Sequence, residues 1–321
     1  MTSLSGKIVV VTGASSGIGR AAAREFAKRG ARLVVAARRE QALEELATEC
    51  RELGAAVLVV PTDVARDDEV ERLVTASLAL ENRIDVWVNN AGTTLFGPLE
   101  DGPFDAHQRV IDTNLFGAMR CARLVVPVFR RQQRGVMVNV GSILSKIGQP
   151  FVPSYVISKF GLRGLSEALR AELADLPHVH VCTLFPYATA TPHFESGANF
   201  TGLAARPIPP VQPPATVAKA LVDLAARPRR ERHVPRIALL GLALHALAPR
   251  AVERVLFDVV REWHLGPEPE ARTRGNLEKP HPSPTTAQGT RLARSGTLGF
   301  VAWFVKYLGH LLGAPMPKAG R

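Results

Sequence analysis

Tyr155 and Lys159 are the two side chains in this sequence whose types and spacing best suit proton chemistry. Residues four apart in a helix lie on one face, about one turn from each other. A phenol alone is a poor base, with a pKa of about 10, but a neighbouring ammonium favours the phenolate and lowers that pKa. Such a pair could exchange a proton with an alcohol or carbonyl oxygen near neutral pH. Taken alone, a surface tyrosine and a surface lysine would explain the same pattern.

The element that must position this pair is a helix. The run 153–174 has apolar residues at near-helical spacing, and it begins with a proline. This periodicity predicts an amphipathic helix in which Tyr155 and Lys159 point the same way.

Length and composition indicate a folded protein with a sizeable core. The chain has 321 residues, of which 46% are hydrophobic and 21% charged, enough for one large α/β domain or two modest ones. The net charge of +11 is concentrated at the C-terminal end, because residues 226–321 carry 16 Lys and Arg against 7 Asp and Glu. A basic tail favours an anionic membrane surface or nucleic acid as a neighbour. A solvated extension explains the charge equally well.

The three cysteines, Cys50, Cys121 and Cys182, stand far apart without metal-ligand spacing. We interpret them as reduced core residues of a cytoplasmic protein and predict no metal site. The sequence contains no signal-like segment and no uninterrupted apolar stretch of the ~20 residues that a spanning helix needs.

A glycine-rich turn follows the first apolar segment, residues 7–12. It reads Gly13-Ala14-Ser15-Ser16-Gly17-Ile18-Gly19 and opens a predicted helix through Ala27. Glycines allow the backbone to turn tightly and to approach a pyrophosphate, which a helix N-terminus favours. The turn also satisfies the GxSxG pattern of hydrolases. We reject that interpretation because only one strand precedes the turn.

Arg38 and Arg39 follow the second predicted strand, 33–37. An acidic residue near this position is typical of proteins that bind NAD, whereas arginine suits a 2′-phosphate. The sequence therefore favours NADP(H) over NAD(H). Alternatively, the two arginines simply begin the helix predicted over 40–53.

Further polar residues follow later strands. Asp63 and Val64 come after strand 56–61, where Asp63 could contact an adenine ring or cap the helix predicted over 67–80. Asn89-Asn90-Ala91-Gly92 follow strand 84–88, and Gly141-Ser142 follow strand 135–140. Asn114 lies in a predicted helix, 106–126, where a buried amide needs hydrogen-bond partners. Open α/β sheets bind ligands at the carboxyl ends of their strands.

Strands that alternate with helices predict an α/β fold with a doubly wound parallel sheet, the Rossmann fold. The last strands are expected over 179–185 and at 233–234. The Gly- and Pro-rich stretch 187–214 is too long for an ordinary connection, so we predict a lid over the substrate.

The order of these motifs resembles the short-chain dehydrogenase/reductase family over about residues 5–235. The resemblance implies that Tyr155 is the general acid/base, that Lys159 holds the nicotinamide ribose and lowers the tyrosine pKa, and that Ser142 positions the substrate oxygen. It implies a proton-relay water at Asn114. The catalytic candidates are thus Asn114, Ser142, Tyr155 and Lys159. The cofactor-binding candidates are Gly13, Ser15, Ser16, Gly17, Ile18, Gly19, Arg38, Arg39, Asp63, Val64, Asn90, Ala91, Gly92, Tyr155, Lys159, Pro186, Thr189 and Thr191.

The chain departs from the family pattern after Pro186, where the family usually has Pro-Gly. Tyr187 replaces that glycine, while Thr191 keeps the spacing of a threonine that binds the nicotinamide carboxamide. The substitution puts a ring where the family has only hydrogen, and we expect it to shape the substrate pocket.

We divide the chain into a catalytic domain (1–235), a helical extension (236–265) with a break at Pro249, a disordered linker (266–295) and an amphipathic C-terminal segment (296–321). The last of these could lie on a membrane, or dock on the domain or on a partner subunit. The leading hypothesis is an NADP(H)-dependent oxidoreductase acting on a carbonyl/alcohol pair, and a membrane-associated position would suit a hydrophobic substrate. The alternative is a non-catalytic dinucleotide-binding or membrane-associated scaffold protein. The family implies a homo-oligomer, and no motif supports nucleic-acid binding.

Overall fold

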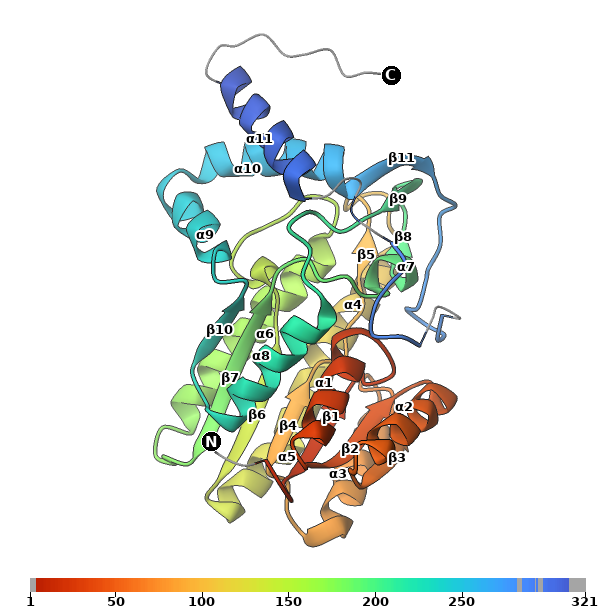
Figure 1. Ribbon diagram of the computed structural model, residues 1–321, viewed down its shortest axis with the longest axis vertical. Helices are drawn as coiled ribbons and strands as arrows, with labels where there is room; N and C mark the ends of the chain where they lie inside the picture. Colours follow the sequence, from red (N-terminus) through yellow and green to blue (C-terminus); the bar gives the residue numbers. More distant parts are fainter. Residues whose placement is uncertain (1–3, 282–284, 292, 294–296, 312–321) are drawn as a thin grey trace.

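A seven-stranded parallel sheet forms the centre of the computed structural model (Figure 1). The structure describes residues 4–281, 285–291, 293 and 297–311. Each pair of neighbouring strands in the sheet is parallel, and the order is β10-β7-β6-β4-β1-β2-β3. The strands are β1 (Ile8–Thr12), β2 (Arg32–Ala37), β3 (Val57–Pro61), β4 (Val86–Asn89), β6 (Gly135–Val140), β7 (Val179–Pro186) and β10 (Glu231–Val234). The predicted doubly wound α/β fold is confirmed.

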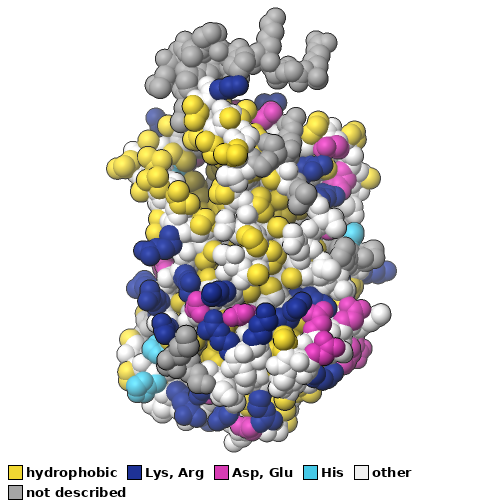
Figure 2. Space-filling view, in the orientation of Figure 1, with side chains coloured by type: hydrophobic (Ala, Val, Ile, Leu, Met, Phe, Trp, Pro, Cys, Tyr) yellow, Lys and Arg dark blue, Asp and Glu magenta, His cyan; other side chains and the backbone are white. Residues whose placement is uncertain are grey.

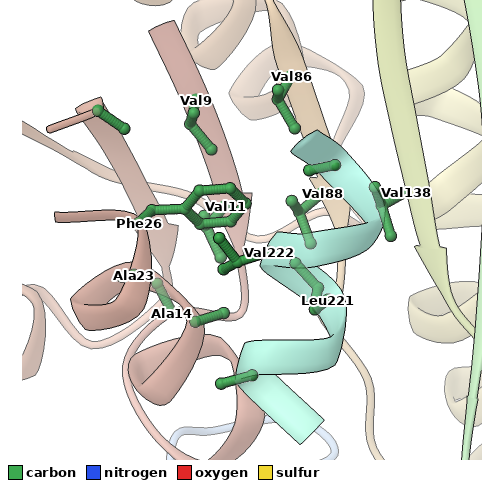
Figure 3. Packing of buried hydrophobic residues seen from close by; sticks show 14 of the residues in the cluster. Val9, Val11, Ala14, Ala23, Phe26, Val86, Val88, Val138, Leu221 and Val222 are labelled. Carbon is green, nitrogen blue, oxygen red and sulfur yellow. The ribbon is translucent and has the colours of Figure 1, made fainter. Parts of the chain in front are cut away.

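Helices cover both faces of this sheet, so its strands are buried on two sides. The helices are α1 (Gly17–Lys28), α2 (Glu40–Glu52) and α8 (Pro214–Ala226) on one face, and α3 (Asp67–Glu81), α5 (Gly117–Gln132) and α6 (Pro153–Glu172) on the other. Alternate residues of β1 serve the two faces because side chains along a strand alternate in direction. Val9 and Val11 belong to the first core, beside Phe26 and Val222 (Figure 3), whereas Ile8 and Val10 belong to the second.

The strand order reverses between β1 and β4, which are neighbours in the sheet. β1 continues through α1 to β2 on one side, whereas β4 is followed in the sheet by β6 on the other. Such a reversal leaves a crevice outside the carboxyl ends of the strands, where open α/β sheets bind ligands. The glycine-rich turn lies at this point.

The helix predicted over 106–126 is divided in the structure. It consists of α4 (Phe104–Ile111), a π-helical turn (Asp112–Phe116) and α5, which starts at Gly117. π-helical turns widen a helix locally and are frequent at functional sites. Here the wide turn contains Asn114, whose side chain hydrogen-bonds to the backbone of Thr93.

The predicted lid, 187–214, contains short elements that lie over the carboxyl end of the sheet (Figure 1). They are α7 (His193–Ser196), β8 (Ala198–Asn199) and β9 (Leu203–Ala205). β8 pairs with β5 (Leu95–Phe96), which follows the end of β4. The lid is thereby attached to the segment that leaves the sheet at the crevice.

The C-terminal extension continues over the same end of the molecule. It comprises α9 (Ala238–Leu247), α10 (Pro249–Val259), a π-helical turn (Val260–His264), β11 (Leu265–Pro269) and α11 (Thr297–Leu311). α10 begins at Pro249, the residue at which the two helices were predicted to be separated. β11 pairs antiparallel with β9 of the lid, so the extension and the lid share a small sheet.

The described part of 266–295 differs from the disordered linker that the sequence predicts. Leu277 is 1% exposed and packs in a cluster with Leu95 and Val110. Arg291 forms an ion pair with Glu270. The Pro- and Gly-rich composition suggested disorder because few apolar residues are present, but one buried leucine and many backbone hydrogen bonds attach the segment to the catalytic domain.

Among the helices that the structure describes, none combines the length and the apolar character needed to cross a bilayer. The C-terminal segment predicted over 296–321 includes α11, while residues 312–321 lie outside the described part.

Candidate active site

The turn between β1 and α1 depends on glycine at two positions. Gly13 has a φ of +66°, and a Cβ atom there would lie 2.7 Å from Cα of Ala91. A Cβ atom on Gly19 would lie 2.3 Å from the carbonyl oxygen of Gly13. Real side chains do not tolerate such approaches, so any other residue would push α1 away from β4. The close packing keeps the N-terminus of α1 beside the crevice.

Thr12 and Asn90 hold the turn against the end of β4. The Thr12 hydroxyl donates to the carbonyl oxygen of Val88, at 3.1 Å, and accepts from the backbone N–H of Asn90. The Asn90 side chain donates to the carbonyl oxygens of Thr12 and Gly13, at 2.9 and 3.2 Å. The amide therefore holds the turn in place, and because Asn90 also lines the cavity, its predicted contact with a cofactor stays a prediction. The role of Thr12 was missed, since a threonine at a strand end carries no signal of its own.

A single cavity of about 730 Å³ connects the glycine turn with the tyrosine and lysine of α6. Gly19 and Asn114 are the two site candidates that do not line it. The candidates that do are Gly13, Ser15, Ser16, Gly17, Ile18, Arg38, Arg39, Asp63, Val64, Asn90, Ala91, Gly92, Ser142, Tyr155, Lys159, Pro186, Thr189 and Thr191.

Asn114 lies just behind the cavity wall and is 1% exposed. Its side-chain oxygen accepts from the backbone N–H of Thr93, at 2.8 Å, and its nitrogen donates to the carbonyl oxygen of Thr93, at 2.9 Å. The same nitrogen donates to the hydroxyl of Ser158 on α6, at 3.0 Å. Asn114 therefore connects the π-helical turn, the end of β4 and the helix that carries Tyr155.

Tyr155 and Lys159 lie on one face of α6, as predicted, and both line the cavity. The Lys159 ammonium nitrogen is 5.5 Å from the centroid of the Tyr155 ring and donates to the carbonyl oxygen of Val140, at 2.9 Å. Ser142 follows the end of β6, and its hydroxyl interacts with that of Tyr155. Three groups that can donate or accept a proton thus converge from α6 and from the end of β6.

Burial dominates the acid–base properties of this group. It raises the pKa of Tyr155 to about 12, while Ser142 acts in the opposite direction. Burial also lowers the pKa of Lys159 to about 8. In this structure the group that lowers the Tyr155 pKa is Ser142, whereas the Lys159 ammonium is directed to the carbonyl oxygen of Val140. The expected effect of Lys159 on the tyrosine pKa stays a prediction.

Arg38 and Arg39 lie at the other end of the cavity, where β2 ends. Arg38 donates to the carbonyl oxygens of Asn276 and Leu277, at 2.5 and 3.2 Å. Arg39 donates to the hydroxyl of Ser15, at 3.3 Å. Burial lowers the pKa of both guanidinium groups. The two arginines and Ser15 form a basic, polar corner of the cavity.

Asp63 lies in the wall next to this corner. Its carboxylate accepts from Nη2 of Arg109, at 2.5 Å, and from the backbone N–H of Ala65, at 3.0 Å. Of the two roles considered from the sequence, helix capping is wrong, because the N-cap residue of α3 is Arg66. The contact with Arg109 was not expected.

The loop after β7 forms the remaining wall near Lys159. Tyr187 donates from its backbone N–H to the carbonyl oxygen of Val234, at 2.8 Å, and from its hydroxyl to Pro209, at 3.3 Å. Thr191 lies against the start of α1, since a Cβ on Gly17 would be 3.3 Å from that of Thr191. The ring that replaces the usual glycine is therefore accommodated with both polar groups hydrogen-bonded.

Comparison with known proteins identifies the family of this chain. The family model described as short chain dehydrogenase matches residues 7–199, which include the glycine turn, Ser142, Tyr155, Lys159 and the loop through Thr191. The chain belongs to the short-chain dehydrogenase family.

Relatives of this short-chain dehydrogenase include an uncharacterized oxidoreductase, YxnA, of Bacillus subtilis, which is 34% identical over 79% of this chain and 73% of its own length. The 11-beta-hydroxysteroid dehydrogenase 1A of Arabidopsis thaliana is 39% identical over 56% of this chain. The match spans about half of the plant protein, at 52%.

Solved structures of the family share its fold. A short-chain dehydrogenase/reductase from Burkholderia phymatum in complex with NAD has a TM-score of 0.70 at 25% identity, over 78% of this chain and 96% of that one. An alcohol dehydrogenase from Thermococcus sibiricus complexed with 5-hydroxy-NADP has a TM-score of 0.63 at 29% identity, over 71% and 94%. This short-chain dehydrogenase is therefore an oxidoreductase.

The outer half of the cavity consists of residues that sequence reasoning missed. They come from β5, the lid and the C-terminal extension, and most are apolar or aromatic: Phe96, His193, Phe194, Ile208, Leu240, Leu244, Val255, Leu256, His264, Phe300 and Phe304. The signal available was only the length of the lid and the apolar periodicity of the extension. Neither shows which residues face the cavity of this short-chain dehydrogenase.

Proposed function

We propose that this short-chain dehydrogenase interconverts a carbonyl and an alcohol on a hydrophobic substrate, with NADP(H) as its cofactor and Tyr155 as the group that transfers the proton. One observation carries the proposal: Tyr155, Ser142 and the glycine turn line the same cavity of about 730 Å³. Separate observations support the choice of cofactor, the proton-transferring residue and the substrate class.

The residues present fit a nicotinamide dinucleotide. Gly13 and Gly17 line the cavity without side chains at the N-terminus of α1, and the partial positive charge of that terminus favours an anion such as a pyrophosphate. Lys159 would hold the nicotinamide ribose, and Thr189 and Thr191 lie in the loop that would contact the carboxamide. When bound, the nicotinamide donates or accepts the hydride.

The preference for NADP(H) rests on the corner formed by Arg38, Arg39 and Ser15. β2 ends in alanine and is followed by the two arginines, without the carboxylate that would hydrogen-bond a ribose 2′-hydroxyl. Arginine offers a planar set of donors that matches a phosphate. The hydroxyl of Ser15, which lies 3.3 Å from Arg39, adds a further donor.

Tyr155 would protonate the carbonyl oxygen during reduction and take up the proton during oxidation. Ser142 would donate a hydrogen bond to the same oxygen and hold it in place. Lys159, which is charged at neutral pH with its pKa of about 8, would stabilise the phenolate that forms when Tyr155 gives up its proton. Asn114 would act as a positioning residue, because it touches α6 through Ser158 rather than the cavity.

A hydrophobic substrate is favoured by the outer half of the cavity, whose wall is formed by apolar residues of α9, α10 and α11. Relatives named hydroxysteroid dehydrogenases support polycyclic ketones and alcohols as the first probes. A non-catalytic dinucleotide-binding protein, the alternative, would have no use for Tyr155 and Ser142 side by side in the cavity.

We further propose that the chain works in the cytoplasm as a homo-oligomer, in peripheral contact with an anionic membrane. α9 carries exposed apolar residues, including Leu240 at 62% and Leu247 at 83% exposure, and Figure 2 has hydrophobic side chains gathered at that end of the molecule. The exposed arginines Arg236, Arg250 and Arg254 lie on and beside α9 and α10 and would favour anionic lipid headgroups.

The decisive experiment measures NADPH and NADH binding by fluorescence, followed by turnover of a panel of cyclic ketones. We expect NADPH to bind more tightly than NADH, and NADPH to be oxidised by wild-type protein but not by Tyr155→Phe. A protein that binds neither nucleotide would contradict the proposal. Equal turnover by wild type and Tyr155→Phe would contradict the assignment of the proton donor.

A further inference from the structure

Four aromatic rings form a continuous wall beyond Tyr155 in the cavity. The ring of His193 lies 5.5 Å from that of Tyr155 and 6.3 Å from that of Phe96. His264 follows, with its ring 5.3 Å from Phe96 and 5.9 Å from Phe194. These spacings are typical of edge and stacked contacts between rings. We call Phe96, His193, Phe194 and His264 the aromatic wall; all four line the cavity.

His264 has a defined tautomer in this wall. Its Nδ1 atom is 2.6 Å from the carbonyl oxygen of Arg206. A carbonyl oxygen only accepts hydrogen bonds, so Nδ1 carries the proton and Nε2 has a lone pair. Burial lowers the pKa of His264 to about 4, and the imidazole is therefore neutral under physiological conditions.

The Nε2 atom of His264 lacks a hydrogen-bond partner among the residues that the structure describes. The side chain is 3% exposed and belongs to a residue that lines the cavity. Buried polar atoms in native proteins are nearly always paired, and an exception calls for a ligand or another explanation. A neutral acceptor with a fixed direction, set between apolar rings, is suited to a donor group on a bound molecule.

We propose that His264 is a substrate-binding residue whose Nε2 accepts a hydrogen bond from a hydroxyl group of the substrate, at the end away from the reacting carbon. The substrate class is then a hydrophobic, ring-containing ketone or alcohol that carries a hydroxyl group in addition to the reacting group. The inference rests on the proposed carbonyl/alcohol chemistry and adds to it the recognition of the far end. His264 lies outside residues 7–199, so this contact comes from the extension of this chain.

Because Nε2 only accepts hydrogen bonds, the proposal distinguishes substrates that carry a donor from those that do not. A hydroxyl can donate to Nε2, whereas a fluorine atom of nearly the same size cannot, and it brings its own lone pairs toward that of the imidazole. Sites built to hydrogen-bond a substrate hydroxyl reject analogues that lack it, because the polar atom of the site is left unpaired. We expect at least about a tenfold preference for the hydroxyl partner, equal to about 1.4 kcal/mol.

The test uses matched ketones built on cyclohexanone, decalone and androstan-3-one skeletons, each with either hydroxyl or fluorine at the far end. Binding is measured with NADPH present in a Tyr155→Phe background, so that the probe is not consumed, and kcat/KM is measured in the otherwise native enzyme. The same measurements are made with His264→Phe, which keeps a ring but removes the acceptor. Trp263→Phe is the control, since Trp263 is the adjacent buried aromatic residue and does not line the cavity.

The proposal expects the hydroxyl preference in wild type and in Trp263→Phe, and its loss in His264→Phe. Absence of the preference on every skeleton in wild type, or its persistence in His264→Phe, overturns it. NADPH binding and thermal unfolding report whether His264→Phe is folded, and His264→Leu serves if it is not.

Failure of this proposal and of the proposed function are distinguishable. Turnover of the ketones without a hydroxyl preference overturns the role of His264 and leaves the oxidoreductase reaction standing. A preference in binding that depends on His264, without turnover of any probe, supports the subsite and counts against the carbonyl/alcohol chemistry on these substrates.

Discussion

Nη2 of Arg38 lies 2.5 Å from the carbonyl oxygen of Asn276, although 238 residues separate the two in the chain. Further along the same segment, the carbonyl oxygen of Thr286 accepts from the backbone N–H of Gly17, at 3.2 Å. The stretch that contains Asn276 and Thr286 therefore contacts both positively polarised groups of the proposed cofactor site, the guanidinium of Arg38 and the N-terminus of α1. A guanidinium has five N–H donors, so Arg38 can hold these carbonyl oxygens and still offer donors to a phosphate.

Arg38→Ala should weaken NADPH binding by about 10- to 100-fold, because a hydrogen bond to a charged group contributes about 1.5–3 kcal/mol. NADH, which lacks the 2′-phosphate, should lose little. Fluorescence titration with both nucleotides measures the difference. An equal loss for the two nucleotides would show that Arg38 acts through its contacts with Asn276 and Leu277 rather than through a phosphate.

Tyr155→Phe should lower kcat by about 10²- to 10⁴-fold, the range expected for loss of a general acid or base. NADPH affinity should remain within a few-fold of wild type, since the phenol hydroxyl is not needed to bind the nucleotide. Ser142→Ala should show a smaller loss in kcat. Steady-state kinetics with a cyclic ketone measure both, and a Tyr155→Phe enzyme with wild-type kcat would refute the assignment.

Lys159→Met should stabilise the protein most near neutral pH. Burial lowers the pKa of Lys159 from 10.5 to about 8, so the folded state disfavours the charged form. The cost is absent well above the unfolded pKa, grows as the pH falls from 10.5 to 8, and is fully present below that range. From the size of the shift, the gain in unfolding free energy at pH 7.5 should exceed that at pH 10.5 by about 3 kcal/mol.

Urea unfolding of both proteins at the two pH values tests this expectation. Tyr155 has a pH dependence of its own. Burial raises its pKa from 10 to about 12, so the folded state favours the neutral phenol. This contribution to the unfolding free energy is lost as the pH rises from 10 to 12. It is common to both proteins and cancels in the comparison. A gain that does not change with pH would mean that the lysine is not desolvated.

Gly19→Ala and Gly164→Ala should have opposite effects, although both glycines lie in helices. A Cβ on Gly19 would be 2.3 Å from the carbonyl oxygen of Gly13, whereas a Cβ on Gly164 meets nothing within 4 Å. We expect Gly19→Ala to destabilise the protein by about 1–3 kcal/mol through overpacking and to weaken NADPH binding. Gly164→Ala should stabilise α6 by up to about 1 kcal/mol. Thermal unfolding of the two variants measures both effects, and unchanged stability of Gly19→Ala would contradict the close contact with Gly13.

Leu240→Glu and Leu247→Glu should each reduce binding to vesicles that contain anionic lipid, by about tenfold, because burial of one leucine contributes about 1.5–3 kcal/mol. Leu53→Glu is the control, since Leu53 is an exposed leucine that follows α2, in the other half of the chain. Vesicle co-sedimentation measures binding. If no more wild-type protein than Leu247→Glu protein sediments with the vesicles, this surface is not a membrane contact.

The parts of the site that could be predicted are those encoded by local sequence. The spacing of Tyr155 and Lys159 fixes their relative position once 153–172 is helical, and the apolar runs of β1 to β7 locate the strand ends at which Ser142 and Asn90 lie. The contacts of Asn276 with Arg38, and the direction of His264, depend on how the C-terminal third packs onto the domain. Neither helical periodicity nor Pro and Gly content carries that information, which is why 266–295 was interpreted as a disordered linker.

Because the cavity is continuous from Arg38 to Phe304, one synthetic molecule could occupy both of its halves. A fragment that mimics nicotinamide, joined to a flat apolar body with a hydroxyl at its end, would meet the common machinery of the family at one end and the extension of this chain at the other. Residues 7–199 carry the family match, whereas Leu240, His264 and Phe300 lie beyond them. An inhibitor anchored there would owe its potency to the half of the cavity within the family match and its selectivity among short-chain dehydrogenases to the extension.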